Sequence, residues 1–178
     1  IEVIANETAC VGFANNPNNG ICINFRDATS NRYSVSEELL LRGSIQQLLR
    51  NPKNRFIAQN GSFDCGWLWY KDRIHVNKVW FDTLLAHHTL YPRMPHNLGY
   101  LTAQYTDHPY YKDEGKTWRE GGNINYFWHY NIKDCCITWT IHNALQRELQ
   151  DQDLEKFFFD HVMRLQPHLV RMQVGGIL

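Results

Sequence analysis

The chain has 178 residues, of which 43% are hydrophobic and 13% aromatic, and this suffices to bury the core of one ordinary domain. Its 18 basic and 18 acidic side chains balance. That balance argues against a general polycation that coats nucleic acid, although not against a local groove in which metal ions meet phosphates. No apolar run approaches the ~20 residues that span a bilayer, so we expect no membrane partner.

The chain contains five cysteines, an odd number without any C-x-x-C pair. This argues against a disulfide framework and against a structural zinc site. It favours reduced, buried thiols in a cytoplasmic protein. The chain starts at Ile1 rather than at a methionine and stops after Gly176-Ile177-Leu178, so we expect a piece of a longer protein.

The first part of the chain has the pattern of an antiparallel hairpin. Ala9–Ala14 and Ile21–Phe25 are short apolar runs of strand character, and the Asn, Pro and Gly residues between them are turn formers. Residues 1–4 have the character of an earlier strand, which the polar Asn6-Glu7 ends. Three strands are therefore predicted before the first helix.

The rest of the chain alternates short strands with helices and then ends in helices. The first predicted helix opens at the capping box Ser34/Glu37 and ends at Asn51-Pro52. It is followed by a strand over 55–59, a helix through 67–70, a strand over 79–81 and a helix over 83–90 that Asp82 caps. The remaining predicted segments are a helix marked by Leu98, Leu101 and Tyr105, a loop over 106–122, a helix over 123–149 and a last helix over about 154–172. An early hairpin followed by βαβ crossovers predicts an α/β fold with one five-stranded mixed sheet flanked by helices.

Aromatic and histidine side chains mostly receive structural interpretations. We expect Trp67, Trp69 and Tyr70 to lie in the core. Phe157–Phe159 is expected to cover the core or to dock a further region of the polypeptide. His87-His88 is expected to lie in the core or on a helix face rather than to bind zinc.

Three acidic residues stand out by their positions. Glu2 lies at the end of the first predicted strand, Asp64 in a strand-to-helix turn, and Asp134 on a late helix, one turn after Tyr130. Sites in α/β folds gather at strand ends and adjoining helix starts. Clustered carboxylates repel one another unless a divalent cation neutralises them, and ligand sets made only of oxygen select Mg²⁺ or Mn²⁺ over zinc. Each carboxylate taken alone is more often a solvated side chain or a helix cap.

Two four-residue spacings carry a family resemblance. Asn60-x-x-x-Asp64 (NGSFD), followed about seventy residues later by Tyr130-x-x-x-Asp134 (YNIKD), resembles motifs two and three of the DEDD 3′–5′ exonucleases. The tyrosine marks the DEDDy branch. His129, five residues before Asp134, has the spacing of the DEDDh branch, in which a histidine acts as general base.

The first motif of that family is Asp-x-Glu on the first strand. Glu2 matches its second half, so the aspartate of the motif would lie immediately before Ile1. Glu7 fits the motif less well, because the strand at Ala9 begins too soon after it for a hairpin turn to intervene. With one metal ligand outside residues 1–178, we expect weak or absent catalysis from these residues alone.

The resemblance extends over most of the chain. Val11–Ala14, Phe81–His88 and Tyr110–Lys116 look like the proofreading domain of family A DNA polymerases, of phage or phage-like type. Leu169–Ile177 resembles the junction into the polymerising region. The resemblance implies an RNase H-like fold, with an exonuclease domain over 1–150 whose first strand is truncated at the N-terminus, and a helix over 151–178 that leads into an absent polymerase domain.

The family implies a two-metal hydrolysis of the 3′-terminal phosphodiester of single-stranded DNA, in a monomer that proofreads for the polymerase domain of the same polypeptide. Glu2, Asp64 and Asp134 would bind two divalent ions, Mg²⁺ or Mn²⁺. The other implied roles are orientation of the attacking water by Tyr130, support of the substrate strand or of the loop around Asp64 by Asn60, and a backbone contact to the terminal nucleotide by Val3.

Two alternatives stay open: an exoribonuclease similar to RNase D, and a catalytically inactive scaffold of the same fold. In the loop, the basic residues would steer a strand and the aromatic residues would stack on unpaired bases. The residues concerned are Lys112, Lys116 and Arg119, and Tyr105, Tyr110 and Tyr111.

Overall fold

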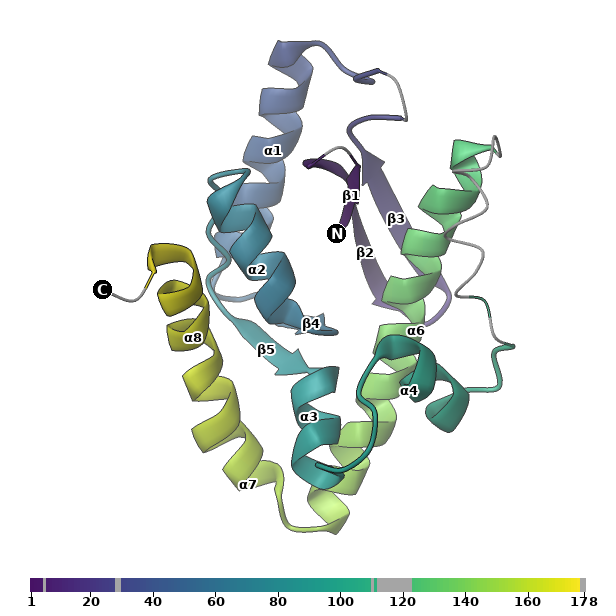
Figure 1. Cartoon of the computed structure of the whole chain (residues 1–178), viewed down its shortest axis with the longest axis vertical. Helices are drawn as coiled ribbons and strands as arrows, with labels where there is room; N and C mark the ends of the chain where they lie inside the picture. Colours follow the sequence, from purple (N-terminus) through teal and green to yellow (C-terminus); the bar gives the residue numbers. More distant parts are fainter. Residues whose placement is uncertain (5, 28–29, 110, 112–122, 177–178) are drawn as a thin grey trace. The chain divides into compact units, whose positions relative to one another are not determined.

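A computed structural model describes residues 1–4, 6–27, 30–109, 111 and 123–176 (Figure 1). The elements in these residues are, in chain order, β1 (Glu2–Ile4), β2 (Glu7–Asn16), β3 (Asn19–Asn24), α1 (Val35–Arg50), β4 (Phe56–Ala58), α2 (Gly61–Tyr70), β5 (Val79–Asp82), α3 (Thr83–Leu90), α4 (Leu98–Tyr105), α6 (Ile124–Asp151), α7 (Glu155–Phe157), a π-helical turn (Phe158–Val162) and α8 (Met163–Gly175). In the described part of the chain, none of the helices combines the length and apolar character needed to cross a membrane.

Several predicted elements are confirmed with their terminal signals. The capping box holds at the start of α1, where the backbone N–H of Ser34 donates to Glu37 over 2.9 Å and the side chains of the two residues are hydrogen-bonded over 2.7 Å. The helix α3 covers Thr83–Leu90 as predicted, and Asp82 caps it. The local sequence therefore determines these helix starts.

The C-terminal helical stretch differs from the single helix predicted over 154–172. A π-helical turn separates α7 from α8, and α8 contains Pro167. A proline has no N–H to donate and its ring crowds the carbonyl four residues earlier, which is that of Met163, the residue directly after the π-helical turn. The helix continues to Gly175, where Gly176 takes a φ of 77°, a conformation that glycine adopts without strain.

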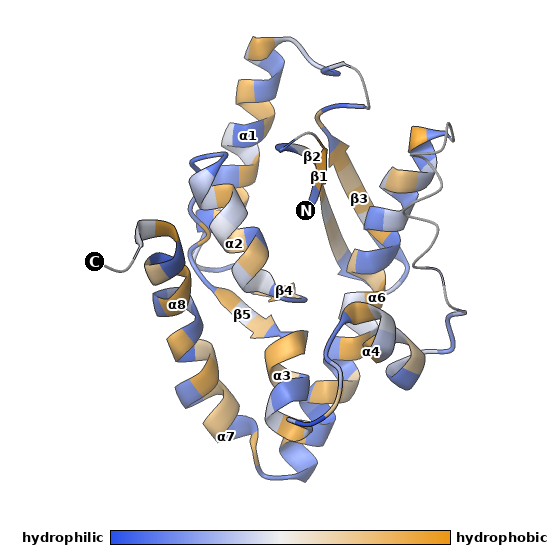
Figure 2. Cartoon of the chain, viewed as in Figure 1, coloured by the Kyte–Doolittle hydropathy of each residue, from blue (hydrophilic) through white to orange (hydrophobic). Residues whose placement is uncertain are grey.

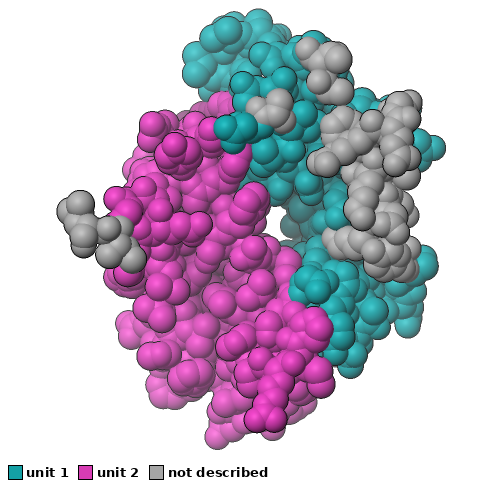
Figure 3. All heavy atoms as spheres, viewed as in Figure 1, with its two compact units in different colours: residues 1–39, 97–141 teal, residues 40–96, 142–178 magenta. Residues whose placement is uncertain are grey.

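The chain divides into two compact units, which are coloured separately in Figure 3. Unit 1 comprises residues 1–39 and 97–141, and unit 2 comprises residues 40–96 and 142–178. Each unit is described by itself. The predicted division into 1–150 and 151–178 concerns a junction to a further domain and stays a prediction.

The α/β class is confirmed, but the single five-stranded mixed sheet is wrong. In the described residues the strands form two sheets: an antiparallel β1-β2-β3 sheet in unit 1 and a parallel β4-β5 pair in unit 2. Apolar runs and turn residues indicate where strands and hairpins lie, whereas pairing between strands far apart in the sequence has no local signal. The first strand spans only Glu2–Ile4, and its pairing is irregular between Glu2 and Val3. A strand this short offers few backbone groups with which a further strand could pair.

In unit 1, α6 packs closely against the β2–β3 hairpin at two glycines. A Cβ at Gly12 would lie 2.1 Å from Oδ1 of Asn131, and a Cβ at Gly20 would lie 2.9 Å from Cγ2 of Ile132. The side chain of Phe127, four residues before Asn131 on the helix, joins the buried cluster around Cys10. The close approach of helix and strands depends on the missing side chains at the glycines.

In unit 2, Phe81 of β5 is the centre of an aromatic core. Its ring lies 4.9 Å from that of Phe158 and 4.5 Å from that of His142, centroid to centroid. Burial lowers the pKa of His142, so a neutral imidazole packs here. In Figure 2 the strand β5 is coloured as apolar over most of its length. Of the three consecutive phenylalanines, Phe158 is fully buried and Phe157 is 51% exposed.

We predict that Gly12→Ala destabilises the protein by about 1–3 kcal/mol, because the added methyl group overlaps Asn131 and α6 must shift. Gly43→Ala is the matched control. A Cβ at Gly43, within α1, meets no atom within 4 Å, so this variant should gain up to ~1 kcal/mol from helix propensity. Urea denaturation measures both variants. Equal stability of the two would show that the glycine contact is not required.

Candidate active site

In unit 1, Tyr130 and Asp134 lie one turn apart on α6, and a third side chain contacts both. The hydroxyl of Tyr111 donates a hydrogen bond to Oδ1 of Asp134 over 2.6 Å. The ring of Tyr111 also lies 5.8 Å from that of Tyr130, centroid to centroid. The structure thus brings together two of the sequence-predicted residues, held by a tyrosine from the segment before α6.

The protonation of Tyr111 suits this role. Burial raises the pKa of Tyr111, and the negative charge of Asp134 and the hydrogen bond to it raise the pKa further. The phenol therefore stays a hydrogen-bond donor to the carboxylate at neutral pH. The predicted stacking of Tyr111 on unpaired bases is wrong, because its side chain is buried; nothing local signals its contact to a residue 23 positions away. His129, the alternative to Tyr130, is exposed.

Glu2 lies on the face of the unit 1 sheet that α6 covers. It is the β1 partner of Cys10 on β2, and directly opposite residues point to the same face. The pKa of the Cys10 thiol is raised by its hydrogen bond with Cys22, by burial and also by the negative charge of Glu2. Alternation places Cys10 and Gly12 on one face, and Gly12 meets α6 beside Asn131 and Cys135. Glu2 and the motif on α6 therefore share one side of the sheet.

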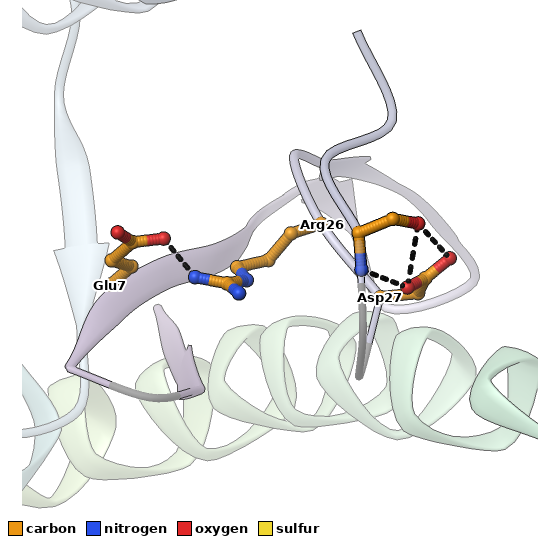
Figure 4. Close-up of polar contacts among 4 residues, drawn as sticks. Glu7, Arg26 and Asp27 are labelled. Carbon is orange, nitrogen blue, oxygen red and sulfur yellow. Dashed lines mark hydrogen bonds and ion pairs between the residues drawn. The ribbon is translucent and has the colours of Figure 1, made fainter.

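Val3 and Glu7 have different surroundings. Val3 is the middle residue of β1 and is half-buried opposite Thr8. Glu7 begins β2 rather than lying on β1, and its carboxylate forms an ion pair with Arg26 (Figure 4). The same figure shows Asp27, the neighbour of Arg26, whose carboxylate accepts hydrogen bonds from Ser30. Glu7 thus lies on β2, opposite Ile4 of β1, and its carboxylate is engaged with Arg26.

In unit 2, Asn60 and Asp64 lie one helical turn apart at the start of α2. Asn60 is the N-cap residue, with φ 59° and ψ 46°, and its side chain makes no capping hydrogen bond. Asparagine tolerates this left-handed conformation better than most residues. Asp64 is in the first turn of α2 and is half-buried. The strand-to-helix turn predicted from the sequence is confirmed, and it leaves the exposed Asn60 amide on the surface of unit 2.

A single buried carboxylate fixes this turn. Oδ1 of Asp82 accepts from the N–H of Asn60 over 3.1 Å, and Oδ2 accepts from that of Gly61 over 2.7 Å. Oδ1 also accepts from Leu84 over 3.0 Å and from Leu85 over 3.4 Å. Burial raises the pKa of Asp82, and the four N–H donors act in the opposite direction. One side chain therefore holds the starts of both α2 and α3.

The cap of α3 is the only role that the sequence predicts for Asp82, whose contact with the turn before α2 was not predicted. No local signal marks this contact: β4 and β5 pair in parallel and Ala58 lies opposite Asp82, so two strand ends that are far apart in the sequence meet at one edge of the sheet. Gly61 is also constrained there, because a Cβ would lie 2.8 Å from the Cβ of Ala58.

The predicted metal ligands are divided between the units. Glu2 and Asp134 belong to unit 1, and Asp64 belongs to unit 2. Over the residues that the structure describes, no group of three or more histidine, cysteine, aspartate or glutamate side chains is placed to hold a metal ion. The donor set itself fits Mg²⁺ or Mn²⁺, because all three side chains are carboxylates that are only partly buried.

The loop residues mostly fall outside this description. Tyr110, Lys112, Lys116 and Arg119 lie outside the described residues, so their predicted roles stay predictions. Tyr105 is the last residue of α4 and is half-buried.

Comparison with known proteins gives one family match. A family model described as 3′-5′ exonuclease matches residues 7–150. The matched segment includes Asn60, Asp64, Tyr130 and Asp134, and it begins after Glu2. No curated protein matches the chain.

We predict that Asp82→Asn lowers the free energy of unfolding by about 2–4 kcal/mol, because the amide nitrogen faces N–H donors and leaves them unpaired in a buried site. Asn97→Ala is the control. Asn97 accepts a single exposed hydrogen bond, from Tyr100 over 3.0 Å at the start of α4, so its loss should cost about 1 kcal/mol. Urea denaturation at pH 7 compares the two. A smaller loss for Asp82→Asn than for Asn97→Ala would contradict the role of this carboxylate.

We predict that Asn60→Gly leaves stability within about 0.5 kcal/mol of the wild type, since glycine adopts the left-handed conformation freely. Asn60→Ala should cost about 1 kcal/mol, because its Cβ disfavours that conformation. Thermal unfolding of both variants gives the comparison. If alanine were as stable as glycine, the backbone conformation would not explain the asparagine.

Proposed function

The chain belongs to the 3′-5′ exonuclease family, and on that premise we propose that it removes nucleotides from the 3′ end of single-stranded DNA as the proofreading domain of a family A DNA polymerase of phage type. The observation that carries the proposal is the local order of the two motifs in the matched segment. Tyr111 holds Asp134 beside Tyr130, and Asp82 fixes the turn from which Asn60 and Asp64 project.

We extend the proposal to the architecture. The fold is RNase H-like, with residues 1–150 as the exonuclease domain and residues 151–178 leading into a polymerase domain on the same polypeptide. Family membership supports this arrangement, and so do the antiparallel hairpin, the parallel β4–β5 pair and the intervening helices. The natural substrate is then a frayed 3′ end, because a scissile phosphate reaches a carboxylate site only when its strand is unpaired.

The proposed metal ligands are Glu2, Asp64 and Asp134, holding two Mg²⁺ or Mn²⁺ ions. When bound, two such ions supply an activated water and stabilise the leaving oxygen of a phosphodiester. The chain contributes the arrangement of the carboxylates. Tyr111 orients the Asp134 carboxylate through the 2.6 Å hydrogen bond, and the short β1–β2 pairing sets the position of Glu2.

The remaining proposed roles concern the water and the substrate strand. Tyr130 orients the attacking water through its hydroxyl, and its packing beside Tyr111 supports a fixed ring position. Asn60 contacts the substrate strand with an exposed side chain that makes no capping bond. Val3 offers a backbone group of β1 to the terminal nucleotide. The exposure of His129 favours Tyr130 as the residue that acts beside Asp134.

The proposal is tested on a polypeptide that includes the residues upstream of Ile1, with 5′-labelled single-stranded DNA, with and without Mg²⁺. We expect a ladder that shortens from the 3′ end only with the metal. Asp64→Ala and Asp134→Ala should lower the rate by about a thousandfold or more, since metal stabilisation supplies several kcal/mol. Glu7→Gln, which removes only the ion pair to Arg26, should keep the rate.

Two further comparisons separate the alternatives. Tyr130→Phe should lower the rate about a hundredfold, the size of a lost proton-transfer or water-positioning group, and His129→Ala should not change it. The reverse pattern would assign the chain to the histidine branch.

Asn60→Gly should weaken activity while stability is kept. Cleavage of an RNA strand in preference to DNA would favour the ribonuclease, and a folded protein inactive on both would favour the scaffold.

A further inference from the structure

Aromatic side chains form a line along the exposed face of α2. Phe63, Trp67 and Tyr70 are spaced by four and three residues, so they project from the same side of the helix. Phe63 is 48% exposed, Tyr70 is 59% exposed, and Trp67 is half-buried. The expectation that Tyr70 lies in the core is therefore wrong. The helix buries Gly61, Gly66 and Leu68 instead. We call Phe63, Trp67 and Tyr70 the aromatic stripe.

The ring faces of the stripe lie close together and carry a cation. The rings of Phe63 and Trp67 are 6.2 Å apart and inclined by only 26°. The ammonium of Lys71 lies 5.7 Å from the centroid of the Trp67 ring and 5.5 Å from that of Tyr70. A lysine in this position is held by the electron-rich faces of the rings and adds positive charge beside an apolar surface.

The segment that follows α2 extends this positive charge. Lys71, Arg73 and Lys78 are all exposed. The one acidic residue among them, Asp72, forms an ion pair with Arg42 of α1, so its charge is compensated within unit 2. The aromatic stripe therefore borders a surface of positive charge.

We propose that the aromatic stripe stacks unpaired bases of single-stranded DNA, while Lys71 and Arg73 contact the phosphates of the same strand. Flat ring faces beside cations bind single strands in general, because every base has a stackable face and every linkage a negative charge. Protein-docking surfaces are depleted in lysine. The positive charge beside the stripe is complementary to the phosphates of a nucleic acid, and this favours a nucleic acid as the occupant.

This inference rests on the proposed function and adds the path of the strand to it. Asp64, a proposed metal ligand, directly follows Phe63 in the sequence, so bases held on the stripe lie along the helix that carries this carboxylate. The nucleotides upstream of the scissile linkage would then be held by stacking, without regard to their sequence. Because stacking is tolerant of base identity, such a platform suits an enzyme that must accept any 3′ end.

The test separates stacking from phosphate binding by comparing two strands in EDTA, where no cleavage occurs. Fluorescence anisotropy measures the affinity of the chain for a labelled ten-residue oligothymidylate and for an abasic strand of the same length. Phe63→Leu with Tyr70→Leu keeps apolar side chains and removes two ring faces. We expect this double variant to bind oligothymidylate about tenfold more weakly and to lose the preference over the abasic strand. Phe157→Leu, which changes a 51% exposed phenylalanine of α7, should bind as the wild type does.

The charge component has its own readout. Lys71→Ala and Arg73→Ala should each lower the slope of log affinity against log salt by about 0.7, the contribution of one phosphate on a single strand. Lys53→Ala, an exposed lysine before β4, should leave the slope unchanged. Circular dichroism confirms that each variant is folded.

Four outcomes overturn the inference. Wild-type protein that binds both strands equally would exclude stacking, and stripe variants that keep the base preference would place it elsewhere. In both cases the cleavage assay with the longer polypeptide still decides the proposed function independently. A wild-type dimer in sedimentation that the stripe variants dissociate would make the stripe a self-association surface. Folded protein without affinity for either strand, and without cleavage, would overturn both proposals.

Discussion

The carboxylate of Asp82 is the interaction on which the strand-to-helix turns of unit 2 depend. It is buried at the end of β5 and accepts four backbone N–H groups, two from the start of α2 and two from the start of α3. Removing a carboxylate from water is unfavourable, and here four donors offset that desolvation. The motif residues Asn60 and Asp64 therefore depend on a side chain 18 or more positions later, which performs no chemistry of its own.

In unit 1, too, side chains and backbone from other segments hold a proposed functional residue in place. The glycines of β2 and β3 let α6 approach the hairpin closely, and this places one face of the helix against the sheet. Tyr111 then fixes the carboxylate of Asp134 from outside the helix. In both units a proposed functional carboxylate belongs to a regular helix, and a side chain from another segment fixes either that carboxylate or the turn that carries it. Rigid elements of this kind hold catalytic groups better than loops do.

Local signals in the sequence predicted a large part of these elements. The capping residues Ser34, Glu37 and Asp82 marked the helix starts, and the turn residues between β2 and β3 marked the hairpin. The pairing of the strands into two sheets, the bond from Tyr111 to Asp134 and the second role of Asp82 were not predicted, because each joins residues far apart in the chain. Tyr70 was misplaced for another reason: an aromatic side chain indicates burial only if the face of its helix is known. The site roles themselves were implied by the family resemblance and stay predictions.

The π-helical turn at Phe158–Val162 changes which side chains of the last helical stretch point inward. In an α-helix, residues five positions apart differ by about 140° around the axis, so Phe158 and Met163 would point to nearly opposite sides. A π-turn bonds residues five apart and aligns them, and both side chains are fully buried. If the same residues were wound as a regular α-helix, α8 would be rotated by about 140° relative to Phe158, which would turn Met163, Gln166 and Val170 away from the core. The π-helical winding of that turn therefore sets the rotational phase of the C-terminal helix.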